Sequence, residues 1–102
     1  MQTANEDLQI LRALCQTKDA ELRRRACEIL RNYEWVDGEH RVIFEVCAAL
    51  DSFGARINVT TVAAQVTRAG FPDVDFDALF EPLPMADTEL AKRLNALERN
   101  AR

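Results

Sequence analysis

The sequence predicts an all-α fold, a compact bundle of five to six helices formed by a single domain over residues 1–102. The length of 102 residues suits one hydrophobic core, and 48% hydrophobic against 29% charged residues is typical of a globular protein. Apolar residues also recur at helical spacing. Only three glycines and three prolines occur, and five of these six lie between Gly54 and Pro84, so the N-terminal half has few helix breakers.

The first helix is predicted to begin at Asn5, whose side chain can act as an N-cap. Glu6 and Asp7 follow in its first turn, where carboxylates interact favourably with the positive end of the helix dipole. Four apolar residues at helical spacing form the face expected to point inward: Leu8, Leu11, Leu14 and Cys15.

A second helix is predicted to run to about Tyr33, and either Thr17 or Asp19 can cap its start. Its expected buried stripe consists of Leu22, Ala26, Ile29, Leu30 and Tyr33. Residues 34–38 then form a connection, in which Trp35 and Val36 are expected to fold back onto the core because apolar side chains are costly to leave in water.

The third helix, from about Gly38 to Phe53, is predicted to lie at the centre of the bundle because it is the most apolar segment. Asp37 can cap its start, and Gly54 follows its end, where left-handed backbone favours glycine. Its inward face consists of Ile43, Val46, Cys47 and Leu50.

A fourth helix is predicted from a cap at Asn58 to Gly70. Its valines and threonines taken alone suggest a strand, but its apolar residues have helical spacing: Val59, Val62, Ala63 and Val66. After a loop around Pro72, Asp75 can cap a short fifth helix that ends before Pro82. We therefore expect the core of the domain to span about residues 5–81.

A C-terminal amphipathic helix is predicted over about residues 87–101. Its apolar residues recur at intervals of 4, 3 and 4, the spacing of a two-helix seam: Leu90, Leu94, Leu97 and Ala101. Two interpretations remain open. The stripe is either a surface for a partner or the last face that closes the bundle.

Charge and cysteine content restrict the environment and the partners. The net charge of −4 repels nucleic acid phosphates, so binding of nucleic acid by the whole surface is not expected. Cys15, Cys27 and Cys47 match neither a disulfide framework nor a redox pair, and we interpret them as reduced core residues. No apolar run is long enough to cross a bilayer and the start lacks the pattern of a signal peptide, so a cytoplasmic protein is expected, with no membrane partner.

No pattern indicates catalysis. A reactive cysteine requires a base beside it, and the single histidine, His40, lies on a different helix face from the centre of the core stripe that contains Cys47. A lone histidine does not make a metal site without further ligands. We therefore expect a protein that is not an enzyme and that holds neither a cofactor nor a metal.

The basic cluster Arg23, Arg24 and Arg25 is, together with Arg41, the weak candidate for phosphate contact. Three consecutive helical residues fan over about 200°, so these arginines do not form one flat phosphate-binding face. Glu21 and Glu28 lie at spacings that allow ion pairs with the cluster, which favours a solvated helix face.

Part of the sequence resembles a known protein family. The run His40-Arg41-Val42-Ile43-Phe44, then Leu50, then Ile57-Asn58-Val59-Thr60-Thr61-Val62 and finally Gly70 is similar to the N-terminal domain of DnaB-type replicative helicases. The resemblance extends over residues 8–102, and its specific part is residues 40–70. It implies a helical bundle in which His40, Ile43, Phe44, Asn58 and Gly70 are structural residues.

The chain also departs from that family. Asn58 stands where the family has aspartate, which costs little because both are efficient N-caps. Residues 71–76 replace a segment with paired glycines, so that corner must be built differently. The sequence stops within the first helix of the family's dimerisation hairpin, and it has no phosphate-binding loop, so this chain alone is not expected to be a helicase.

The expected function is that of a non-catalytic protein–protein interaction module. Apolar anchors such as Leu90, Leu94 and Leu97 would enter a groove on a partner or on a second copy. The resemblance implies a link to DNA replication, with a helicase, a primase or a helicase loader as candidate partners besides self-association. The alternative is a small helical nucleic-acid-binding regulator.

Overall fold

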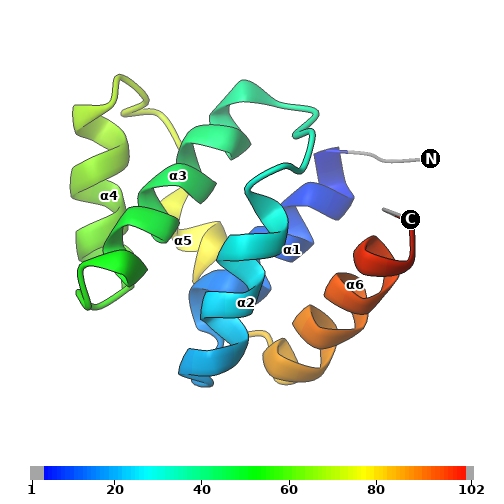
Figure 1. Ribbon diagram of the computed structural model, residues 1–102. Helices are drawn as coiled ribbons and strands as arrows, with labels where there is room; N and C mark the ends of the chain where they lie inside the picture. Colours follow the sequence, from blue (N-terminus) through cyan, green and yellow to red (C-terminus); the bar gives the residue numbers. More distant parts are fainter. Residues whose placement is uncertain (1–3, 101–102) are drawn as a thin grey trace.

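The computed structural model of the protein describes residues 4–100, and these residues form six helices and no strand, which confirms the predicted all-α fold (Figure 1). The helices are α1 (Ala4–Gln16), α2 (Ala20–Leu30), α3 (Gly38–Ser52), α4 (Val59–Arg68), α5 (Phe76–Leu79) and α6 (Ala86–Asn100).

Helix α1 lies at the centre of the bundle. It contacts α3, α5 and α6, while α4 packs outside α3 and α5, and α2 packs against α3 and α6 (Figure 1). Because neighbours cover α1 on several sides, Ile10 and Ala13 are buried as well as Leu11, Leu14 and Cys15 of the predicted stripe, while Leu8 is half-buried. The prediction that the third helix is central is therefore corrected: α3 contacts α1, α2 and α4 but exposes Glu45 and Ala49.

Side-chain caps begin four of the helices as the sequence predicts. Asp19 rather than Thr17 caps α2, Asp37 caps α3 and Asp75 caps α5. At α4 a full capping box forms, in which the Asn58 carboxamide oxygen accepts from the Thr61 amide at 2.9 Å and the Thr61 hydroxyl accepts from the Asn58 amide at 3.0 Å. The prediction for α1 is wrong, because Asn5 lies inside that helix.

Glycines follow the ends of α3 and α4 in the left-handed region of the backbone. Gly54 has a φ of 69° and Gly70 a φ of 104°, so a side chain at either position is strained. Helix α2 ends at Leu30, three residues before the predicted end. The chain leaves the helix there because the Tyr33 hydroxyl is bound to a carboxylate on α1.

Helix α6 closes the bundle. Leu90 and Leu94 are both 0% exposed and belong to the same core as the residues of α1 and α3, while Leu97 packs against it. The interpretation of this stripe as a partner surface is therefore corrected, because its two central side chains are already covered by α1 and α2. The core extends past residue 81, and Ala101 lies outside the described residues.

The connection between α5 and α6 is held by polar side chains of α1. The Gln16 carboxamide donates to the carbonyl oxygens of Leu79 (3.0 Å) and Glu81 (2.6 Å) and accepts from the Leu83 amide (2.9 Å). Arg12 also donates to the Glu81 carbonyl, at 3.1 Å. These bonds satisfy backbone groups of a segment that forms no helix, and so they fix the direction in which α6 starts.

Candidate functional site

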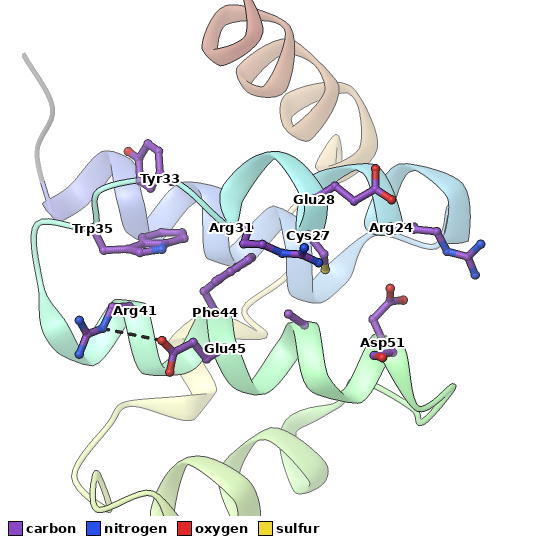
Figure 2. A pocket seen from close by; sticks show the side chains of 12 residues that line it. Arg24, Cys27, Glu28, Arg31, Tyr33, Trp35, Arg41, Phe44, Glu45 and Asp51 are labelled. Carbon is purple, nitrogen blue, oxygen red and sulfur yellow. Dashed lines mark ion pairs between the residues drawn. The ribbon is translucent and has the colours of Figure 1, made fainter. Parts of the chain in front are cut away.

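A groove of about 570 Å³ lies between α2 and α3 (Figure 2). Its volume falls within the usual range of ligand and docking sites in proteins, about 300–1,000 Å³. The lining residues come from both helices and from the loop that joins them: Arg24, Cys27, Glu28, Arg31, Tyr33, Trp35, Arg41, Phe44, Glu45, Ala48, Asp51 and Ser52.

The walls of the groove follow from helical periodicity. On α2 the charged residues Arg24, Glu28 and Arg31 are spaced by four and three, so they lie on one face of the helix. Arg41 and Glu45 lie on the face of α3 that lines the groove, in the N-terminal half of that helix. Figure 2 shows that the two helices run antiparallel, with the loop that carries Trp35 at the end where Arg31 and Arg41 lie.

The floor of the groove is apolar and partly aromatic. Trp35 lies over Phe44, with ring centroids 5.5 Å apart, and meets Tyr33 edge-on at 4.7 Å. Phe44 is buried, and Cys27 is half-buried between the walls. The expectation that Trp35 folds back onto the core is confirmed, since it packs against the buried cluster. The same expectation for Val36 is wrong, because Val36 is 56% exposed.

Asp7 fixes the position of the loop that ends the groove. Its carboxylate is 0% exposed and accepts from the Tyr33 hydroxyl at 2.6 Å and from the Val36 amide at 2.9 Å. We assigned Asp7 only to the start of the first helix, and so its role in the loop was missed. The available signal is that Asp7 shares the spacing of Leu11 and Leu14, which places it on the inward face.

The four arginines proposed for phosphate contact do not come together. Arg23 donates to the Thr17 carbonyl at 2.7 Å and lies 3.9 Å from Asp51, and Arg25 binds Asn95 and Glu98 of α6. Arg24 is exposed on the rim of the groove (Figure 2). Arg41, on the opposite wall, lies 3.9 Å from Glu45. The cluster therefore fans out as predicted, and two of its members are already bonded to other helices or loops.

The residues that carry the family resemblance occupy structural positions. Ile43 and Phe44 are buried in the core, Asn58 caps α4 and Gly70 supplies the left-handed residue after it. His40 lies in the first turn of α3, partly buried, and its Nδ1 atom has no hydrogen-bond partner.

A second apolar surface was missed by the sequence reasoning. Val46, Ala49, Leu50 and Phe53 of α3 and its end form a shallow hollow of about 170 Å³ with Gln65 of α4, and Phe53 is 86% exposed. Sequence periodicity does not identify this surface, because Phe53 is the residue at which the helix ends and its direction depends on the turn at Gly54.

The cysteine and tyrosine side chains of this region are protonated at neutral pH. Burial, followed by the negative charge of Asp51, raises the pKa of Cys27 to about 12. Burial and the hydrogen bond to Asp7 raise the pKa of Tyr33 well above its ordinary value. The contact with Cys15 and complete burial raise the pKa of Cys47. Such thiols are poor nucleophiles, because the thiolate is the reactive form.

Stability is expected to fall as pH rises above about 9. In an unfolded chain the pKa of cysteine is about 8.5 and that of tyrosine is about 10. Folding raises the pKa of Cys27 to about 12, and it also raises the pKa of Tyr33 well above the unfolded value. Because both pKa values are higher in the folded state, the two groups contribute fully to stability when the pH is below their unfolded-state pKa values. That contribution is lost as the pH rises toward their folded-state pKa values. Thermal unfolding between about pH 8 and pH 11 measures this loss. Cys27→Ala should reduce this loss of stability. If the dependence of the melting temperature on pH is the same in this variant, the loss belongs to other groups.

Neither a metal site nor a membrane span is present in the described part of the chain. Within residues 4–100, no three histidine, cysteine or carboxylate side chains are grouped so that they could hold a metal ion. Among the helices of these residues, none has both the length and the apolar character needed to cross a bilayer.

The fold and the groove define a small, all-helical domain in which two antiparallel helices present an apolar floor between charged walls. The chain belongs to the DnaB-like helicase N terminal domain family, whose model matches residues 9–81. Comparisons with curated proteins and with solved structures gave no significant match. The matched residues include α2, α3 and the whole groove, whereas α6 lies beyond them although it completes the core.

Proposed function

We propose that this domain is a non-catalytic protein-interaction module of a DNA replication system and that the α2–α3 groove is its docking site. The groove carries the proposal, because it combines an apolar floor with charged walls on a chain of the helicase N-terminal family. The raised pKa values of Cys27 and Cys47 favour binding over catalysis, because a protonated thiol is a poor nucleophile.

The occupant that fits this groove is an amphipathic helix of a partner protein. Two antiparallel helices leave a channel along their axes, and a third helix packs into such a channel through apolar residues three and four positions apart. Phe44, Trp35 and Ala48 would contact the apolar side of that helix. Arg24, Glu28 and Arg31, which form no ion pair with any residue that the structure describes, would meet its flanking charges.

The family suggests a replicative helicase, a primase or a helicase loader as the source of that helix, in the cytoplasm. The alternative function, nucleic acid binding, is weakened because Arg23 and Arg25 are engaged within the domain and the net charge is −4. Nucleic acid binding would require Arg24 and Arg41, on opposite walls of the groove, to contact phosphates. Three carboxylates line the same groove: Glu28, Glu45 and Asp51.

Titration of the isotope-labelled domain with purified helicase, primase and loader tests the proposal by nuclear magnetic resonance. Amide shifts are expected along α2 and α3 with one of these proteins. Arg24→Glu, which changes an exposed rim charge, and Ala48→Gln, which fills the floor, should each weaken binding at least about tenfold, or ~1.4 kcal/mol.

Arg68→Glu is the matched control, since Arg68 is exposed at the end of α4 and does not line the groove. Its affinity should equal that of the unchanged chain. Shifts confined to the hollow around Phe53 would place docking elsewhere and contradict the groove. An electrophoretic shift of DNA at low salt that Arg24→Glu abolishes would support the alternative instead.

A further inference from the structure

Two of the three cysteines meet in the core. The Sγ atoms of Cys15 on α1 and Cys47 on α3 are 3.6 Å apart, and both residues are buried, with 5% and 0% of their surface exposed. Both are free thiols, and the helices that carry them pack directly against each other. Residues separated by 32 positions along the chain are thus placed sulfur to sulfur.

This contact is close enough to become covalent with little movement. A disulfide requires the sulfur atoms to approach to about 2.05 Å, which is roughly 1.5 Å closer than they lie here. Forming the bond therefore requires rotation of the two side chains and a shift of the helices that carry them. Cys27 differs, because it is half-buried at the groove (Figure 2) and its sulfur forms no hydrogen bond. The pairing is therefore specific among the three thiols.

We propose that Cys15 and Cys47 form a redox latch, a disulfide made under hydroperoxide stress that fastens α1 to α3. One thiolate attacks a peroxide oxygen, the O–O bond breaks, and a sulfenic acid and water result. The second sulfur then attacks the sulfenic sulfur, the S–O bond breaks, and the departing hydroxide takes up a proton as water. Two thiols lose two electrons and two protons, and one hydrogen peroxide becomes two waters.

The latch closes a covalent loop that carries most of the groove lining, while Ala48, Asp51 and Ser52 lie just outside it. Helix α2, the loop with Trp35 and the first part of α3 lie between Cys15 and Cys47 along the chain. Closing this loop restricts the unfolded chain, so the oxidised protein is more resistant to unfolding. Small thiols reverse the step by exchange. Because the contact with Cys15 and burial raise the pKa of Cys47, the latch forms slowly at neutral pH and faster at alkaline pH.

Peptide mapping of the full chain tests the latch directly. Cleavage after lysine and arginine places the three cysteines on separate peptides, 13–18, 26–31 and 42–56. After treatment with hydrogen peroxide and alkylation in denaturant, peptide 13–18 is expected to be linked to peptide 42–56, with peptide 26–31 alkylated. The melting temperature should rise by roughly 10 °C and return when a reductant is added.

Three results overturn the latch: three alkylated cysteines after oxidation, a linkage that contains peptide 26–31, or sulfinic acids in place of a linkage. Cys47→Ala should abolish the rise in melting temperature, and Cys27→Ala, the matched control, should retain it. If Cys47→Ala does not fold, the map of the unchanged chain decides alone.

Discussion

Replacing Asp7 by alanine is expected to lower the free energy of unfolding by about 3–4 kcal/mol. The carboxylate is buried, and its loss leaves the Tyr33 hydroxyl and the Val36 amide without their acceptor. Both bonds are partly buried, so donors that lose this charged acceptor are only partly compensated by water. Urea unfolding followed by the fluorescence of Trp35, the single tryptophan, measures both the stability and the looseness of the loop.

Asp73→Ala is the control for this prediction, because Asp73 is an exposed loop residue, and its effect should remain within about 0.5 kcal/mol. Tyr33→Phe removes one donor together with its bond and should cost less than Asp7→Ala, about 1 kcal/mol. An Asp7→Ala variant as stable as the unchanged chain would mean that removing a buried charge offsets both lost bonds.

Local rules predicted the beginnings and ends of the helices well because their causes lie within a few residues. Asp19, Asp37, Asn58 and Asp75 cap helices with their own side chains, and Gly54 adopts the left-handed backbone that a following glycine permits. The start of α1 was predicted incorrectly. Several polar residues lie close together there, and Asn5 is only one of them, whereas the helix already includes Ala4.

The groove was not predicted because it depends on how two helices approach each other. Arg24 and Glu28 belong to the pattern that predicts a solvated helix face, and the residues of α3 that line the other wall belong to a separate segment of the sequence. Neither segment alone predicts the distance between the two helices. That distance is set from outside the groove, by Asp7 on α1 holding the loop that joins the two helices.

The leucine stripe of α6 left two interpretations open for a similar reason. A seam spacing shows that one face is apolar but does not identify what covers it. The hydrogen bonds between Gln16 and the backbone of Leu79, Glu81 and Leu83 fix the turn that places α6 along α1 and α2. The leucine stripe then packs against these two helices of the same chain. A partner must dock on a different surface.

Leu94→Asp is therefore expected to unfold the domain. The substitution removes a leucine that is 0% exposed and places a carboxylate among apolar neighbours, which together cost more than about 4 kcal/mol. A domain of this size has a stability of roughly 5–15 kcal/mol, so little helical structure should survive moderate heating. Circular dichroism and sedimentation measure the outcome. Lys92→Asp, on the exposed side of the same helix, should change stability by about 0.5 kcal/mol or less. A Leu94→Asp chain that remains helical and only loses self-association would contradict the closed bundle, because a leucine that tolerates a charge must face a partner and not the core.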